Sequence, residues 1–372
     1  MAPNYWMDLT DGKEDNPTLV AGGYSIRHID KKLTVITLNT SPYIPTHSGA
    51  HISGDLNDPL GQFKWLKKTL RRLLHEKKYV LICGHVPPIL HMTDGDYQWK
   101  RKYIEKYIYI ITLFAHIFKA QMFGHTHGYE MHAFMLRETV VPLYVVGSMS
   151  PVYGSNPSFA VWEYDKITYE ILDYHVFGTR GTENMQQGKW EHIFSATKSY
   201  GLDNLSKKQL KILSKRFDDH ENELLAAEYQ NNRYARSERR KHVYCKDAAC
   251  RAIVACSSTW FTDIHELYKC QLEKSKYFMS KIPGIEPGKL KTLDVIKRLE
   301  AEMSTSRMLY PALETGLTEK PVFNTLLTCA IASLTVLLLA IIILVLYKVF
   351  GIKFLSVKGI QTEKSKPMKV AP

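Results

Sequence analysis

The sequence lacks the features that mark several common classes of protein. Its first sixteen residues, MAPNYWMDLTDGKEDN, contain no apolar stretch, so no secretory signal peptide is visible. It contains no internal repeat and no low-complexity tract, which excludes a repeat architecture. The formal net charge is +12, but acids and bases are mostly intermixed and no nucleic-acid recognition motif accompanies them. We therefore expect no nucleic-acid partner.

Charge is also absent from residues 321–347, and Leu326 to Leu346 is almost wholly apolar. About 20 such residues span the hydrocarbon core of a bilayer, whereas a soluble helix rarely stays apolar on every face over this length. The segment therefore predicts a transmembrane helix. By the positive-inside rule, the basic tail that follows lies in the cytosol, so residues before Pro321 face the lumen or the cell exterior. The tail carries Lys348, Lys353, Lys358, Lys364, Lys366 and Lys369 against one acid, Glu363.

Cysteine is scarce, with six residues in the chain, of which four cluster: Cys245, Cys250, Cys256 and Cys270. In an oxidising compartment such a cluster is typical of two local disulfides. A zinc site is the competing interpretation, and the absence of any CxxC pair makes it the weaker one. Of the other two, Cys83 lies in an apolar run and Cys329 within the membrane segment. The same orientation allows glycosylation at the sequons that begin with Asn39 and Asn204.

Alternating strands and helices are predicted for the first half of the chain. With 372 residues and 45% hydrophobic content, the chain is long enough for more than one domain. The predicted strands are 33–38, 79–83, 120–123 and 143–146, with a hairpin over 159–174, and the predicted helices are 61–75 and 99–118. This order indicates an α/β layered domain. After about residue 177 the pattern becomes helical up to about residue 270, with a capping box at Ser206 and Gln209.

Two short motifs directly follow predicted strands. One is Gly84-His85-Val86-Pro87-Pro88 and the other is Gly124-His125-Thr126-His127. A strand that stops at Gly-His places an imidazole at the carboxyl edge of a sheet, where α/β active sites gather. His125 and His127 are two residues apart and so share one side of an extended loop. Neutral imidazole suits zinc, iron or manganese, so the pattern predicts metal ligands at His85, His125 and His127.

The two motifs are similar to the last two metal-binding motifs of the calcineurin-like metallophosphoesterases. Neighbouring residues narrow the resemblance to the acid sphingomyelinase-like phosphodiesterase family. They are Gly22-Gly23-Tyr24-Ser25, Leu38-Asn39, residues 58–66, Asn156-Pro157, Ser199-Tyr200-Gly201-Leu202 and the four clustered cysteines. The resemblance runs from about residue 22 to residue 270, so the linker, the membrane segment and the tail lie outside it.

The resemblance implies a two-metal hydrolase in which a metal-activated water attacks a phosphodiester. Carried over by motif, His85 and His125 would bind one Zn²⁺ ion and His127 the other, while Cys245 would pair with Cys250 and Cys256 with Cys270. The predicted fold is α/β: the C-terminal half of a layered α/β/β/α metallophosphoesterase fold, then a helical, disulfide-stapled C-terminal domain and one transmembrane helix. The predicted boundaries are 1–176 for the metallophosphoesterase part, 177–275 for the helical domain, 276–320 for a linker, 321–347 for the transmembrane helix and 348–372 for the tail.

The family's upstream motifs, Asp-x-His, Gly-Asp and Gly-Asn-His, are absent from the chain where the family has them. They supply the remaining metal ligands and the general-acid histidine, so the catalytic residues are unassigned. Three histidines without a bridging carboxylate cannot hold two divalent ions against their mutual repulsion. We therefore expect the chain to be incomplete, to bind metal weakly and to hydrolyse little. We also expect a half-sheet open on one face, with no aspartate opposite the histidines.

The leading hypothesis is a membrane-anchored phosphodiesterase whose main domain is extracellular or lumenal, in lysosomes, in endosomes or at the cell surface. Its substrate would be sphingomyelin or a related phospholipid, or else a nucleotide phosphoester or polyphosphate. The alternative is a catalytically inactive, membrane-tethered binding or structural module that retains half of the fold. Near the motifs, His91, Asp94 and Asp96 could line the substrate pocket, although a solvated loop is the simpler interpretation, and His132 is a minor candidate for phosphate contact.

Overall fold

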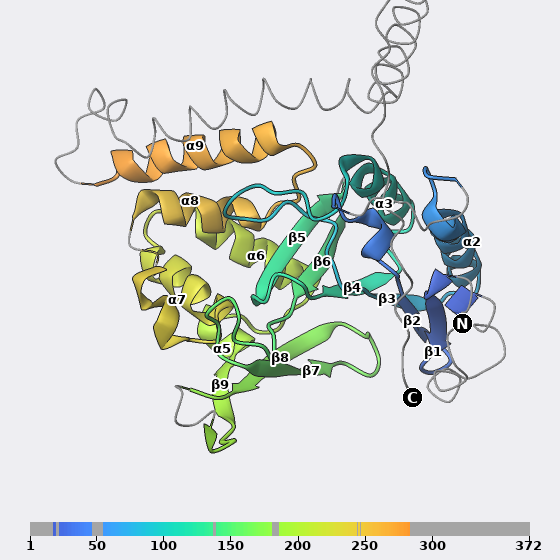
Figure 1. Ribbon diagram of the computed structural model, residues 1–372, viewed down its shortest axis with the longest axis horizontal. Helices are drawn as coiled ribbons and strands as arrows, with labels where there is room; N and C mark the ends of the chain where they lie inside the picture. Colours follow the sequence, from blue (N-terminus) through green and yellow to red (C-terminus); the bar gives the residue numbers. More distant parts are fainter. Residues whose placement is uncertain are drawn as a thin grey trace, which may run out of the picture. The chain divides into compact units, whose positions relative to one another are not determined.

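Short apolar runs form the centre of a six-stranded sheet (Figure 1). The computed structural model describes residues 18–19, 22–46, 55–136, 139–180, 186–243, 245 and 247–282. The strands of this sheet are β1 (Ser25–His28), β2 (Leu33–Thr37), β3 (Tyr79–Cys83), β4 (Phe118–Phe123), β5 (Glu130–Leu136) and β6 (Thr139–Val145), in the order β1-β2-β3-β4-β6-β5. β2, β3, β4 and β6 run parallel, whereas β1 and β5 are antiparallel to their neighbours. The predicted α/β fold class is confirmed at this level.

Two helices cover one face of this sheet. They are α2 (Gln62–His75) and α3 (Arg101–Leu113), and their buried side chains share one apolar core with β2, β3, β4 and β6. In α2 the buried residues recur at helical spacing, as predicted. The predicted helix 99–118 is too long at both ends. Lys100 is still extended, with ψ 132°, and Phe118 already pairs with Val80 in the sheet.

A second, antiparallel sheet and the later helices pack against the opposite face. The sheet consists of β7 (Ser158–Tyr164), β8 (Ile171–Gly178) and β9 (Glu191–Ser195), and it contains the predicted hairpin. The helices are α5 (Ala196–Tyr200), α6 (Lys207–Asp218), α7 (Glu223–Arg233), α8 (Ala248–Ser257) and α9 (Ile264–Ser280). Short 3-10 helices elsewhere in the described chain are Ser41–Tyr43, Pro59–Gly61 and Glu238–Val243. Both sheets and α6–α9 contribute to one core, and the predicted boundary at residue 176 lies within β8.

Both predicted disulfides are present, and together they staple α8 at its two ends. Cys245–Cys250 joins the first turn of α8 to the residues before it, and Cys256–Cys270 joins its last turn to α9. The loops that they close are short, with sequence separations of 5 and 14 residues. The predicted pairing is therefore confirmed, and it ties α8 and α9 into one unit.

The predicted capping box at the start of α6 is wrong. Ser206 is the N-cap residue, but its side chain makes no capping hydrogen bond. The Gln209 amide instead donates to Asp203 Oδ2 at 2.6 Å, outside the helix. The sequence therefore predicted where α6 begins, but it did not predict the hydrogen bonds that Ser206 and Gln209 make there.

The second face of β1, β2 and β3 is only partly covered. Arg27 and Thr37 are exposed, and Val35, Leu81 and Cys83 are half-buried, although all five lie in paired strands. These side chains alternate with the buried residues of the same strands, so they point away from α2 and α3. This face is therefore less covered here than at β5 and β6, whose residues belong to the core shared with the second sheet, and the expected open face stays a prediction.

The outer edge of β5 is bonded to the helical region. The Met131 N–H donates to the Tyr229 hydroxyl at 2.8 Å, and the Ala133 N–H donates to the Ser258 carbonyl at 3.0 Å. Alternate N–H groups of an edge strand point outward, so these two donors would otherwise be free to pair with another strand. Side chains and backbone from α7 and from the end of α8 satisfy them instead.

Among the described helices, none is long and apolar enough to cross a bilayer. The predicted transmembrane helix at 321–347 and the tail at 348–372 lie outside the described residues, as does most of the predicted linker. The first residues assigned to that linker belong to α9, which continues to Ser280.

The packing of α2 can be tested at two neighbouring positions. Leu70 is fully buried and Arg71 is exposed. Leu70→Ala should lower the free energy of unfolding by about 2–5 kcal/mol, because it removes buried apolar atoms and leaves a cavity. Arg71→Ala should change it by less than about 0.5 kcal/mol. Urea denaturation measures both, and equal effects would contradict this packing.

Candidate functional site

Two parallel strands place two histidines side by side. β3 continues directly into Gly84-His85, and its neighbour β4 continues into Gly124-His125. The carboxyl ends of parallel strands meet at one edge of a sheet, so the two imidazoles meet there. His125 Nδ1 lies 3.3 Å from His85 Nε2, with the rings arranged edge to face. The Gly124 N–H donates to the His85 carbonyl at 2.8 Å, which holds the two loops together.

The backbone around these histidines is tightly constrained. A Cβ atom at Gly84 would lie 2.7 Å from the Phe123 ring and 2.9 Å from the Thr40 methyl, so only glycine fits this strand end. His125 and His127 have φ values of 71° and 57°, in the left-handed region that residues other than glycine rarely adopt. Backbone conformations of this kind persist only where the surrounding structure holds them, and they cluster at binding sites.

His127 lies apart from the His85–His125 pair. Its ring packs edge to face against Tyr153, with centroids 4.9 Å apart. Its buried Nδ1 atom has no hydrogen-bond partner within the described part of the chain. A buried ring nitrogen without a partner is unusual and points to a partner that the described residues do not supply. The structure thus brings His85 and His125 together, and it places His127 on the same loop but facing a different neighbour.

The site favours neutral imidazoles. Burial lowers the pKa of His125 below its ordinary value, and the neighbouring imidazoles of His85, His127 and His91 lower it further. Burial also lowers the pKa of His127, again with a smaller contribution from His85. A neutral imidazole keeps a lone pair for a cation, so this electrostatic environment suits metal ligands.

The donor set fits a divalent metal ion only in part. Imidazole nitrogen is a common ligand for zinc and other transition metals, and the described site offers three such groups. Yet no three His, Cys, Asp or Glu side chains within the described residues lie close enough together to hold a metal ion. The histidines would therefore need further ligands. Within the described residues no aspartate completes a cluster with them.

Sequence reasoning missed a buried ion pair behind the histidine loop. Glu130 and Arg233 meet with 2.6 Å between Glu130 Oε1 and Arg233 Nη2. Burial by itself would raise the pKa of Glu130, but the Arg233 guanidinium, together with His132 and the more distant His91, outweighs it and holds the pKa well below its usual value. His132 is buried on β5 and lies 3.2 Å from Glu130 Oε2, rather than facing the loop surface. No local signal marks the pair, because its partners are 103 residues apart.

His91 and Asp94 border the site as a hydrogen-bonded pair. His91 Nδ1 lies 2.8 Å from each carboxylate oxygen of Asp94, so this nitrogen carries the proton and donates it. His91 Nε2 then faces Arg233 Nη2, at 3.5 Å, as an acceptor. The Asp94 side chain is exposed, as the simpler interpretation of this loop predicted. His91 is half-buried and close enough to influence His125.

The two predicted glycosylation residues differ in their surroundings. Asn39 is half-buried, and its Nδ2 donates to the Gly22 carbonyl at 2.8 Å. A glycan on this nitrogen would have to displace that bond. Asn204 uses its Oδ1 atom to accept from the Ser206 N–H at 2.9 Å, which leaves its Nδ2 out of that bond. Glycosylation at both positions stays a prediction.

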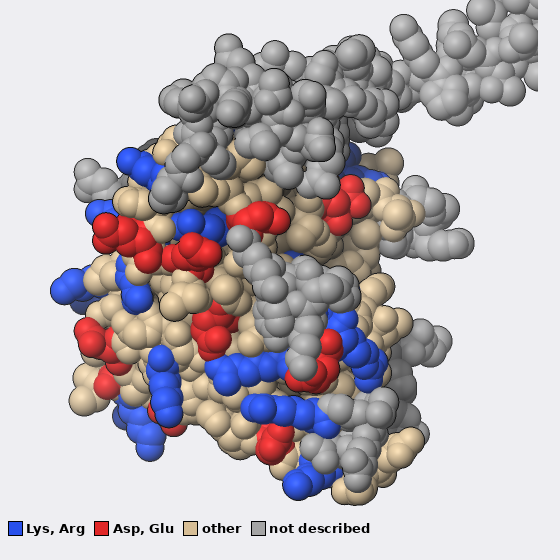
Figure 2. Space-filling view, turned by 90° about the vertical axis from the view of Figure 1, so that its left-hand side faces the viewer, with Lys and Arg blue, Asp and Glu red and all other residues tan. Residues whose placement is uncertain are grey.

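The surface charge is mixed in sign. Figure 2 shows one face of the molecule, on which basic and acidic side chains are interspersed and neither sign forms a continuous patch. This agrees with the intermixed pattern of the sequence, where the formal net charge of +12 has no recognition motif beside it.

Comparison with known proteins shows similarity to one family over the second half of the described chain. Residues 132–276 match the family model described as the acid sphingomyelin phosphodiesterase C-terminal region. That segment begins on β5, directly behind the histidine loop, and ends within α9. Over this segment the chain is similar to the acid sphingomyelinase-like phosphodiesterases.

Individual proteins with the same similarity come from several organisms. Cyclic GMP-AMP phosphodiesterase SMPDL3A from Bos taurus is 29% identical over 213 residues, which cover 54% of this chain and 47% of the relative. Sphingomyelinase phosphodiesterase C from Dictyostelium discoideum is 25% identical over 208 residues, covering 51% and 46%. Human acid sphingomyelinase-like phosphodiesterase 3b is 27% identical over 187 residues, covering 46% and 40%. The chain thus spans about half the length of these relatives, or less.

Among solved structures, a dimetal phosphatase from Danio rerio is similar with 13% identity and a TM-score of 0.29, over 42% of this chain and 58% of that one. A TM-score of this size is too low to assign a fold or a site.

The electrostatic coupling between the histidines can be tested by titration. His85→Ala removes one neighbouring imidazole, so the pKa of His125 should rise toward the ordinary value of 6.5 without reaching it, because burial remains. The pKa of His125 is lower in the folded chain than in the unfolded chain. His125 therefore contributes stability at pH values above its unfolded pKa, and this contribution is lost as the pH falls through its folded pKa. NMR titration of the ring protons in the metal-free chain measures the shift.

His75→Ala is the matched control, because His75 is an exposed residue at the end of α2. It should leave the titration of His125 unchanged. An unchanged His125 titration in His85→Ala would contradict the described contact between the two imidazoles.

Proposed function

We propose that this protein is a metal-dependent phosphodiesterase whose metal ligands include His85, His125 and His127. The observation that carries the proposal is the meeting of His85 and His125 at the ends of β3 and β4, 3.3 Å apart. Histidines at the carboxyl ends of neighbouring parallel strands are positioned to share a ligand. Similarity to proteins named as phosphodiesterases supports hydrolysis of a phosphoric ester as the reaction.

The residues of the chain would act by binding and orientation. His85 and His125 would hold one Zn²⁺ ion, and the unpartnered Nδ1 of His127 would be free to hold another. Bound zinc would supply charge for the phosphate oxygens and lower the pKa of a water molecule. Tyr153, which is 58% exposed and packs on His127, would flank the substrate. The lowered pKa values of His125 and His127 keep both rings in the form that binds a cation.

The substrate class that we propose is a phosphodiester, with a sphingomyelin-like phospholipid first and a nucleotide phosphoester or polyphosphate second. The relatives are named for cyclic GMP-AMP and for sphingomyelin, so the family accommodates both kinds of ester. The apolar sequence at 321–347 favours a lipid substrate, because a membrane anchor would hold the site near a bilayer.

We also propose that the main domain lies outside the cytosol, with the basic C-terminal tail inside. The two disulfides support this location, because such bonds persist in oxidising compartments. The apolar segment followed by lysines supports the same orientation. Lysosomes, endosomes and the cell surface all satisfy these conditions.

One observation favours a second function, namely a non-enzymatic binding or structural module tethered to a membrane. Within the described residues, the three histidines form no complete three-ligand cluster. A site that holds a metal ion weakly would support binding of a phosphate-bearing partner better than turnover. The two functions differ in whether added zinc produces hydrolysis.

The enzyme proposal predicts zinc-dependent hydrolysis of a chromogenic phosphodiester, bis(p-nitrophenyl) phosphate, by the purified full chain, at a low rate because the three histidines lack the further ligands that two ions need. Chelation should abolish the activity and zinc should restore it. His125→Ala should reduce the rate at least about 100-fold, because losing a ligand is more severe than losing one of its outer partners. His116→Ala is the control, because His116 is an exposed residue after α3 and should leave the rate unchanged.

Equal rates in wild type and His125→Ala would contradict the assignment of this histidine. A wild-type chain that takes up no zinc and hydrolyses neither this ester nor sphingomyelin would favour the non-enzymatic module. Elemental analysis of the dialysed protein separates weak zinc binding from none.

A further inference from the structure

The buried ion pair behind the histidine loop unites two distant parts of the chain. Glu130 begins β5, three residues after His127, and Arg233 ends α7. Arg233 Nε and Nη2 both donate to Glu130 Oε1, at 3.0 and 2.6 Å. The two side chains are 2% and 1% exposed. Neither residue belongs to the Gly-His motifs, and neither side chain is accessible to a substrate.

Three contacts tie this pair to the loop. The Thr126 hydroxyl, between the two histidines, donates to Glu130 Oε1 at 3.2 Å. The Tyr129 N–H donates to the Arg233 carbonyl at 2.9 Å. A Cβ atom at Gly128 would lie 3.0 Å from Arg233 Cγ, so the loop backbone packs directly on the arginine side chain. The loop is therefore held in its middle and at its end by the same two residues.

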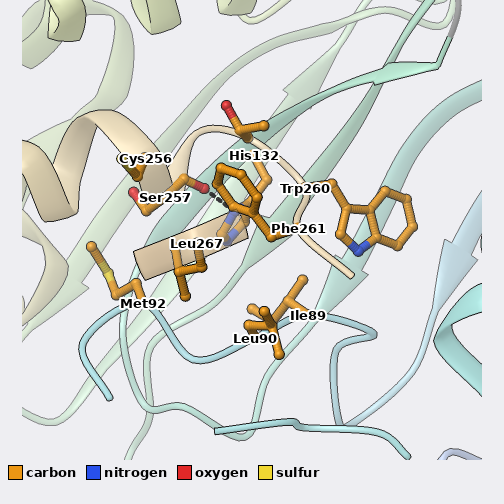
Figure 3. Close-up of a pocket in the computed structure, with 10 residues that line it drawn as sticks. Ile89, Leu90, Met92, His132, Cys256, Ser257, Trp260, Phe261 and Leu267 are labelled. Carbon is orange, nitrogen blue, oxygen red and sulfur yellow. Dashed lines mark hydrogen bonds between the residues drawn. The ribbon is translucent and has the colours of Figure 1, made fainter. Parts of the chain in front are cut away.

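The far side of the pair is anchored to the disulfide-stapled helices. His132 Nε2 lies 3.2 Å from Glu130 Oε2, and His132 Nδ1 donates to the Ser257 carbonyl at the end of α8. Figure 3 shows His132 reaching Ser257 across the wall of a cavity of about 10 Å³, which has room for one water molecule at most. Glu130 Oε2, the second carboxylate oxygen, therefore has His132 as its partner.

The energetics of a buried ion pair favour a role in fixing the position of the loop over a role in stabilising the fold. Replacing a buried ion pair by apolar residues of similar volume is often neutral or stabilising, because the charges lose hydration. An apolar pair at these positions would fill the core but could not bind Thr126 or His132. What Glu130 and Arg233 add is therefore the fixed position of the loop, whose left-handed residues need external support.

We propose that Glu130 and Arg233 are positioning residues that hold His125 and His127 in their metal-binding conformation. This inference rests on the proposed function for the ligand role of the histidines. The pair contacts neither metal nor substrate, and it acts through Thr126, Gly128 and the Tyr129 backbone.

The test compares Glu130→Gln and Arg233→Met with Glu170→Gln in the full chain. Glu170 pairs with Lys119, near the start of β4, at 2.9 Å, so its variant also breaks an ion pair but away from the loop. Hydrogen exchange of the metal-free chains reports on the amides of residues 124–129. We expect faster exchange there in Glu130→Gln and Arg233→Met, and wild-type exchange in Glu170→Gln. Zinc affinity should fall about 10–100-fold in the first two variants and stay unchanged in the third.

The proposal is overturned if the loop exchanges at the same rate in Glu130→Gln as in Glu170→Gln. If a single variant does not fold, the double variant Glu130→Leu with Arg233→Met removes both charges and leaves no unpaired one. It should melt cooperatively and still show faster loop exchange, and a protected loop in it would also overturn the proposal. Because the exchange measurement needs no metal, failure of wild type to bind zinc would count against the proposed function alone.

Discussion

The parallel pairing of β3 with β4 is the constraint on which the site depends. Cys83 lies opposite Met122, so the two strands end within one residue of each other and each Gly-His step begins at the same edge. The Gly84 N–H donates to the Met122 carbonyl at 3.1 Å, which continues the ladder up to the first motif. A slip of one residue would turn alternate side chains to the other face of the sheet and separate the two imidazoles. The core beneath α2 and α3 fixes this register, because it buries one face of both strands.

Features with a local cause could be predicted from the sequence. The strand 79–83 is found as expected, because an uninterrupted apolar run ending at Gly-His has few other structures available. β4 also begins and ends near its predicted position, and the meeting of His85 with His125 follows from these two strands. The disulfide pairing agrees with the resemblance to the family.

Features with a distant cause could not be predicted. β5 contains Glu130 and His132, whose polar side chains hide the strand in any local pattern. They are buried because Arg233 donates hydrogen bonds to Glu130 and the Ser257 carbonyl accepts one from His132, and both partners lie more than 100 residues later. The sequence did not predict β9 for a similar reason, since its buried residues Ile193 and Phe194 pack on a core that other segments form. The end of α3 was misplaced because pairing in the sheet overrides helical periodicity there.

The helical region supports the sheet as well as packing on it. α7 contributes the Tyr229 hydroxyl and the Arg233 carbonyl and guanidinium to β5 and to the loop before it. α8, held by a disulfide at each end, contributes the Ser257 carbonyl to His132. Residues 132–276, which define the family match, therefore include much of the structure that stands behind the histidines.

The bonds along the outer edge of β5 have a consequence for behaviour at high concentration. An uncovered edge strand is a template on which a second chain can add a strand, and aggregation often starts there. In this protein the outward N–H groups of Met131 and Ala133 are already bonded to Tyr229 and Ser258. A foreign strand would first have to detach α7 and the end of α8, which the Cys256–Cys270 crosslink opposes. Reducing agents would therefore be expected to promote self-association through this edge before they unfold the parallel centre of the sheet.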